Sequence, residues 1–151
     1  MSQQEGLLAH KIAIQSTKNM LKQLSGIDVL KIYENNENQE LNELYLAYCS
    51  RYDYNEEPYS QISYDCSEEE IYQWLIDIME LKQEEYFFLC NQLWCKIKMI
   101  DLYGAVSSLW KSHKNTKGFL LAEIDLSRII DCGSDSRDEY NYLIDIWERQ
   151  K

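Results

Sequence analysis

The chain has 151 residues, of which 45% are hydrophobic and 13% aromatic, and its formal net charge is −11 at pH 7. This composition excludes a disordered chain, and the length fits one domain, residues 1–151, with a buried core. The negative charge disfavours direct binding to nucleic acid or to an anionic membrane, because carboxylates and phosphates repel each other.

Two helices are expected in the first third of the chain. Residues 5–24 carry a loose apolar stripe ahead of a glycine stop signal. The second helix follows a polar connector, and its apolar positions have the i, i+3, i+4, i+7 spacing of an amphipathic helix. These positions are Leu41, Leu44, Tyr45 and Tyr48.

A third helix is expected to begin after Ser67. The Ser67 hydroxyl can accept a hydrogen bond from the Glu70 amide while the Glu70 carboxylate reaches back, which forms a capping box. Before this helix, residues 51–65 contain the single proline and lack a helical period, so we expect an ordered loop or a short edge element there. The apolar positions of the third helix are Ile71, Trp74, Leu75, Ile78 and Met79.

The pattern changes to strands in the second half of the chain. Residues 86–90 form a short apolar run, and residues 95–99 alternate between apolar and polar. Two strands joined by a turn around residues 91–92 therefore predict a hairpin, in which Lys96 and Lys98 face water.

The remaining elements complete the expected fold. A helix is predicted over residues 100–112, followed by a turn at residues 114–118. Strands are predicted over residues 119–125 and 140–147, separated by a loop at residues 133–136. The sequence therefore predicts an α+β protein, with a helical N-terminal half followed by a β-β-α-β-β antiparallel sheet.

The sequence offers little support for catalysis. The five glycines stand apart, so no glycine-rich phosphate loop is expected. Cys90 and Cys95 lack a second pair of metal ligands, and packing as small core residues is the better interpretation. The only histidines, His10 and His113, are not part of a nucleophile motif. We expect no enzyme activity, catalytic residue, metal, cofactor or small-molecule substrate.

The cysteines and the N-terminus indicate the compartment. Five cysteines at irregular spacing are typical of reduced thiols rather than of a disulfide framework. His10 and Lys11 interrupt the short apolar run near the N-terminus, so a secretory signal is not expected. No window is long and apolar enough for a membrane span. These features predict a cytoplasmic protein.

The negative charge is concentrated in residues 34–70, here called the acidic segment. It holds eleven acidic residues and one basic residue, which gives −10 of the whole-chain −11. Eight of the twelve tyrosines lie within or beside it. Glu68, Glu69 and Glu70 have a sufficient explanation as helix-capping charges. The candidate partner-binding residues are Glu34, Glu37, Glu40, Glu43, Tyr45, Tyr48, Tyr52, Asp53, Tyr54, Glu56, Glu57 and Tyr59.

Two interpretations of the acidic segment are open. In the first, it is a solvated face whose tyrosine rings pack inward. In the second, the tyrosines anchor a protein partner, because they give large and rigid contacts, and the carboxylates steer a basic partner toward them. Such a partner would be a protein with a cationic, phosphate-binding surface.

A small, acidic chain that is rich in Tyr and Trp and has no catalytic motif resembles the immunity proteins of bacterial toxin–immunity systems. These systems include contact-dependent growth inhibition and the colicins. The resemblance rests on composition and on the acidic segment. It implies an inhibitor that binds a basic protein toxin, commonly a nuclease, and neutralises it by occluding the active site or the substrate groove.

Two other functions are compatible with the sequence. The first is a DNA mimic or anti-defence protein, in which carboxylates imitate phosphates and block a nucleic-acid-binding enzyme. Competition against several unrelated DNA-binding proteins would indicate a mimic, whereas one dedicated partner would indicate immunity. The second is a small enzyme that uses a carboxylate or His113.

Overall fold

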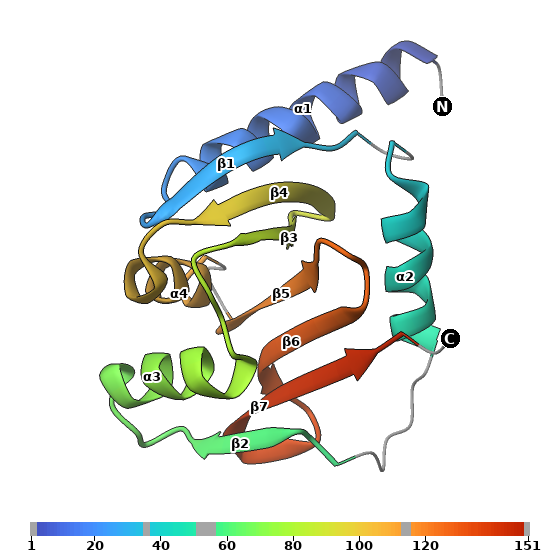
Figure 1. The fold of residues 1–151 in the computed structure, drawn as a ribbon. Helices are drawn as coiled ribbons and strands as arrows, with labels where there is room; N and C mark the ends of the chain where they lie inside the picture. The colour runs from blue at the N-terminus through green and yellow to red at the C-terminus, as the bar shows by residue number, and fades with distance from the viewer. Residues whose placement is uncertain (1–2, 35–36, 51–56, 113–115, 150–151) are drawn as a thin grey trace.

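The computed structural model describes residues 3–34, 37–50, 57–112 and 116–149 (Figure 1). The helices are α1 (Gln3–Leu21), α2 (Gln39–Ser50), α3 (Glu68–Met79) and α4 (Leu102–Trp110). The strands are β1 (Ile27–Ile32), β2 (Ser60–Ser63), β3 (Glu85–Cys90), β4 (Leu93–Met99), β5 (Gly118–Glu123), β6 (Arg128–Asp135) and β7 (Asp138–Glu148). Helices and strands both contribute, and the expected α+β class is confirmed.

Within the described residues, seven strands form one antiparallel sheet in the order β1-β4-β3-β5-β6-β7-β2. The predicted hairpin is β3 and β4, and Asn91 and Gln92 both have positive φ in the two-residue turn that joins them. Strands from the second half of the chain form the centre of the sheet. The two strands from the first half, β1 and β2, lie at its opposite edges (Figure 1).

The expected β-β-α-β-β order is wrong by one strand, because β6 was not predicted. Where a loop was expected at residues 133–136, β6 continues to Asp135 and only a tight turn precedes β7. Gly133 has a φ of +139°, and a Cβ atom there would lie 2.3 Å from the backbone oxygen of Lys117. The close approach of β5 and β6 therefore requires this glycine. The sequence pattern was interpreted as turn chemistry, although the cause is a contact between strands.

The edge strand β1 was not predicted, and its surface explains why. Its four central residues are exposed, so the apolar alternation of a half-buried strand is missing. A register shift between Val29 and Lys31 breaks the remaining period. The other edge strand, β2, falls where a loop or short edge element was expected, and pairs with β7. Both edge strands are therefore recognised by their pairing with a neighbouring strand and not by a local sequence pattern.

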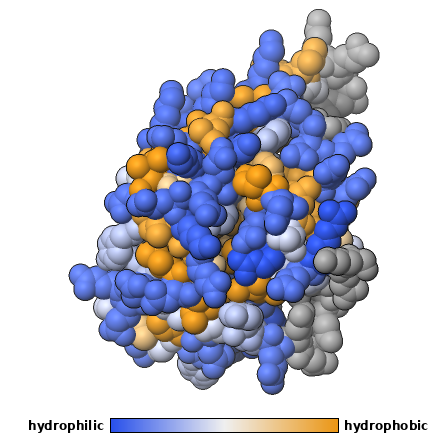
Figure 2. Space-filling view, in the orientation of Figure 1, coloured by the Kyte–Doolittle hydropathy of each residue, from blue (hydrophilic) through white to orange (hydrophobic). Residues whose placement is uncertain are grey.

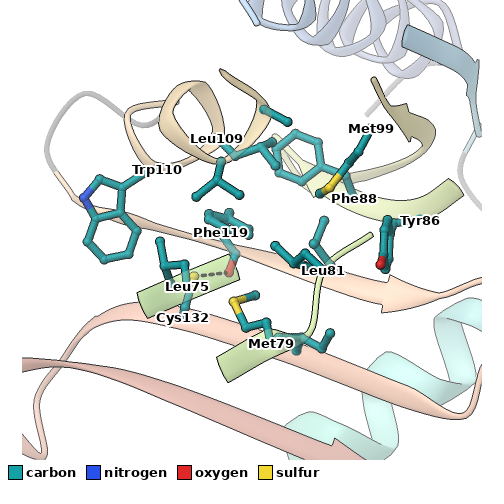
Figure 3. Close-up of a cluster of buried hydrophobic side chains, with 14 of the residues drawn as sticks. Leu75, Met79, Leu81, Tyr86, Phe88, Met99, Leu109, Trp110, Phe119 and Cys132 are labelled. Carbon is teal, nitrogen blue, oxygen red and sulfur yellow. Dashed lines mark hydrogen bonds between the residues drawn. The ribbon is translucent and has the colours of Figure 1, made fainter. Parts of the chain in front are cut away.

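One face of the sheet packs against α3 and α4. Figure 3 shows side chains of these two helices meeting side chains from the strands. Leu75 and Met79 of α3 and Leu109 of α4 are fully buried with Phe88 at the centre of β3. The periodic apolar positions of both helices face this core, as expected for amphipathic helices over a sheet.

The opposite face of the sheet packs against α2. Leu41 and Leu44 of this helix are buried against side chains that alternate with those of the first core. The strands contribute Phe87, Trp94, Ala122 and Ile129 to this second core. Both faces of the central strands are thus covered, which fixes α2 on the side of the molecule away from α3 and α4 (Figure 1).

Helix α1 uses only half of its predicted apolar stripe. Near its C-terminal end, Thr17 is buried and accepts a hydrogen bond from the Asn91 side chain at 3.4 Å. Leu8 and Ile12, nearer the N-terminus, are about 60% exposed. The N-terminal end of α1 extends past the sheet (Figure 1). The side of the molecule seen in Figure 2 is largely hydrophilic, with smaller hydrophobic patches between.

Replacing Ser67 by alanine is expected to lower the free energy of unfolding by about 1 kcal/mol. The Glu70 N–H donates to Ser67 Oγ at 3.2 Å, and the Ser67 hydroxyl donates to Glu70 Oε1 at 3.1 Å, so the predicted capping interaction is present. Urea denaturation measures the loss. Ser67→Thr keeps the hydroxyl and should retain most of the stability. Equal losses in the two variants would show that the cap hydrogen bond contributes nothing.

Candidate functional site

Helix α2 presents the first part of the acidic segment to solvent. Its N-terminus is fixed by Asn38, whose Oδ1 accepts the Leu41 N–H at 3.1 Å. The apolar stripe faces the sheet, so the opposite stripe, which includes Glu40 and Glu43, is exposed. No lysine or arginine occurs in the sequence of α2. The helix therefore has an acidic outer face without an internal counterion.

Four of the predicted acidic residues lie on or beside this helix and are exposed: Glu34, Glu37, Glu40 and Glu43. We define the α2 surface as these four residues together with Tyr45 and Leu46. Across the described ranges, no cation lies within salt-bridge distance of Glu40 or Glu43. Two carboxylates on one exposed helix face are therefore free to act on an incoming charge.

The other two carboxylates of the α2 surface have partners. Glu37 Oε1 lies 3.2 Å from Lys31 Nζ, and Glu34 Oε2 lies 4.0 Å from His10 Nε2. Hydrogen bonding to the Glu34 backbone N–H, followed by the contact with Lys31, lowers the pKa of Glu37. Glu37 therefore keeps its charge to a lower pH than an unperturbed glutamate does.

The two tyrosines of α2 differ in their environment. Tyr45 is half-buried and makes an edge-to-face contact with Trp94, with ring centroids 5.7 Å apart. Tyr48 is only 7% exposed, and its hydroxyl donates to Asp131 Oδ2 at 2.7 Å. Tyr48 thus joins α2 to the core, in agreement with the first interpretation of the tyrosines, and its ring is not available to a partner. We leave it out of the α2 surface.

The remaining candidates follow α2 in the chain. Glu57 is exposed, and Tyr59 is 64% exposed just before β2, where its N–H donates to the Ile144 oxygen at 2.8 Å. These two residues precede the edge strand β2 and are not part of the α2 surface. The other four candidates, Tyr52, Asp53, Tyr54 and Glu56, lie outside the described residues.

A groove of about 470 Å³ lies beside the α2 surface, between α2 and the adjoining parts of β1 and β4. Three aromatic residues, Tyr33, Tyr45 and Trp94, line it, together with Glu34. Asn38, Asn42 and Leu46 of the α2 region complete its helical side. The structure therefore brings two predicted residues, Glu34 and Tyr45, into one concave site.

Sequence reasoning missed several residues of this groove. Leu46 could have been found, because it is apolar but lies off the buried stripe of α2 and is exposed. Trp94 could not, because only the packing of the β3–β4 hairpin under α2 brings it there. Tyr33 follows β1, whose position depends on pairing with β4.

A larger hollow of about 890 Å³ lies at another end of the sheet, where β3 begins and β5 ends. Its lining mixes acids with bases, and Arg128 is paired with Glu123 there. Hydrogen bonds from Ser127 lower the pKa of Asp125, whereas a carboxylic general acid needs a raised pKa. The chemistry of this hollow thus gives weaker support for a site than that of the smaller groove.

Two cysteines lie in the environment that the sequence predicts. Cys90 and Cys95 are buried core residues on neighbouring strands, as predicted. Burial raises the pKa of Cys90 to about 11 and that of Cys95 to about 12, so both thiols are protonated at neutral pH. In the described part of the chain, no three potential ligands converge on a metal position. His113 lies outside the described residues.

Comparisons with known proteins were made at the level of family, sequence and structure. No family model, curated protein or solved structure matches this chain. Among the residues that the structure describes, no helix has both the length and the apolar character needed to cross a membrane. The charge and shape of the α2 surface are thus the observations on which a function is proposed.

Proposed function

We propose that this chain is an inhibitor of the immunity-protein type, which binds a basic protein toxin stoichiometrically and neutralises it. A nuclease is the expected toxin, because an enzyme that binds nucleic acid has a cationic surface for the phosphates. Such a surface is complementary to the acidic α2 surface. The observation that carries the proposal is the α2 surface, where exposed carboxylates on a helix without basic residues flank an aromatic groove.

Each part of the α2 surface has a role in this mechanism. The unpaired carboxylates of Glu40 and Glu43 attract a cationic surface over several ångströms and raise the rate of encounter. Tyr45 is held in place by its edge-to-face contact with Trp94, so little conformational freedom is lost on binding. A partner docked here would have its cationic groove covered and could not bind nucleic acid. No turnover is involved.

The experiment purifies the chain together with the product of the neighbouring reading frame and measures the association of the two proteins. We expect the association rate constant to fall roughly 10- to 100-fold between low and high salt, because exposed charges are screened beyond about 10 Å at 0.1 M ionic strength. An association rate that does not change with salt would contradict electrostatic steering. Failure of the two proteins to form a one-to-one complex would contradict the proposal as a whole.

The DNA-mimic alternative predicts a different pattern of binding. A mimic would compete with DNA for several unrelated DNA-binding proteins, since its charges replace phosphates. The α2 surface combines charge with an aromatic groove, which suits a dedicated protein partner better than a phosphate imitation. Competition for unrelated DNA-binding proteins at equal affinity would favour the mimic and count against the immunity proposal.

A further inference from the structure

The groove beside α2 has the chemical features of a site for a cationic side chain. Its volume of about 470 Å³ is sufficient for a small ligand. Tyr33 and Tyr45 are partly exposed and offer aromatic surface, Trp94 is only 5% exposed behind them, and Glu34 also lines the groove. In the described ranges, neither a lysine nor an arginine lines it. A cation entering the groove would therefore meet attraction from rings and from a carboxylate.

The rings of the groove are held in place before any ligand binds. Tyr33 packs edge-to-face on Phe87 at 5.9 Å between centroids, and Tyr45 packs in the same way on Trp94 at 5.7 Å. Phe87 and Trp94 are buried in the core under α2. The groove is thus preorganised, and a ligand need not order its wall.

A cation of this protein already occupies a comparable environment next to the groove. Lys31 Nζ lies 4.9 Å from the centroid of the Tyr33 ring and 3.2 Å from Glu37 Oε1. A ring and a carboxylate together therefore hold a positive charge on this surface. In the groove, Tyr45 and Glu34 offer the same pair of groups to an external cation.

We infer that the groove receives an arginine side chain of the protein partner. This inference rests on the proposed function, because it identifies which group of a basic toxin the α2 surface recognises. Arginine fits better than lysine, since its planar guanidinium stacks on aromatic rings and forms paired hydrogen bonds with a carboxylate such as Glu34. Asn42 also lines the groove, and its amide oxygen can accept a further N–H group.

The test titrates the full chain with the peptide acetyl-Gly-Arg-Gly-amide and follows the Trp94 indole and Asn42 amide signals by NMR. The matched peptide with citrulline in place of arginine has nearly the same shape without the charge. We expect saturable shifts confined to the groove, and binding of the citrulline peptide at least roughly tenfold weaker. Equal binding of the two peptides, or shifts spread over all acidic residues, would overturn the inference.

Two variants locate the site. Glu34→Gln removes the carboxylate of the groove and should weaken arginine-peptide binding several-fold, whereas Glu57→Gln removes an exposed carboxylate outside it and should have no effect. Equal effects of the two substitutions would also overturn the inference. If the arginine peptide does not bind but the toxin still associates in a salt-dependent manner, this inference alone fails. If the peptide binds and no toxin does, the proposed function fails instead.

Discussion

Replacement of Phe88 by alanine is expected to lower the free energy of unfolding by roughly 3–5 kcal/mol. Phe88 has no exposed surface and lies at the centre of β3, under the side chains of α3 and α4 (Figure 3). Truncation removes apolar contacts and leaves a cavity, because a close-packed core between a sheet and two helices relaxes only partly. Domains of this size have a total stability of about 5–15 kcal/mol, so the loss is a large fraction of it.

Urea denaturation followed by tryptophan fluorescence measures this loss for Phe88. Tyr140→Ala is the matched control, because it truncates an aromatic side chain of the same sheet that is 75% exposed. Its effect should stay within about 0.5 kcal/mol. Phe88→Leu, which keeps most of the volume, should cost less than alanine and provides a folded variant if Phe88→Ala does not fold. Similar losses for Phe88→Ala and Tyr140→Ala would contradict the packing described for this core.

Glu40 and Glu43 of α2 have no cationic partner among the described residues, and reversing both with Glu40→Lys and Glu43→Lys is expected to weaken binding of the proposed toxin by roughly 100- to 1,000-fold. Like charges brought together at an interface cost several kcal/mol, and about 1.4 kcal/mol corresponds to a factor of ten. Both side chains are exposed and have no cation within salt-bridge distance in the described residues. The two substitutions should therefore lower the association rate constant and leave the stability of the core nearly unchanged.

The matched control for this charge reversal is Glu69→Lys with Glu139→Lys. It changes the net charge by the same amount, and Glu69 occupies the first turn of α3 as Glu40 occupies the first turn of α2. The cost at the helix dipole is therefore similar in both variants. Surface plasmon resonance and thermal denaturation compare them. If the control weakens toxin binding as much as the α2 variant, net charge rather than the α2 surface determines affinity.

Much of the fold was predictable where the signal is local. Helix α3 combines a capping serine, acids in its first turn and an apolar period, all within about a dozen residues. The β3–β4 hairpin combines two short strands with a two-residue turn. The edge strand β1 was missed because its residues lack alternation. Strand β6 was missed too, because Gly133, which serves strand packing, was interpreted as part of a loop.

The residues of the candidate site were likewise predictable only in part. Its acidic residues could be read from the sequence, because charged side chains remain on the surface wherever their helix lies. Whether each tyrosine is exposed or buried could not be predicted, since the same helical period that exposes Glu43 buries Tyr48 against Asp131. The groove also needs Trp94 from a hairpin that is distant in the sequence.

The sequence by itself determined the α+β class, the helix that begins after Ser67, and the concentration of negative charge between residues 34 and 70. These properties depend on residue type and on neighbours within a few positions. The tertiary structure alone decided that α2 covers a second face of the sheet and that the acidic segment borders an aromatic groove. Both depend on strand pairing and side-chain packing between residues far apart in the chain, which no local pattern encodes.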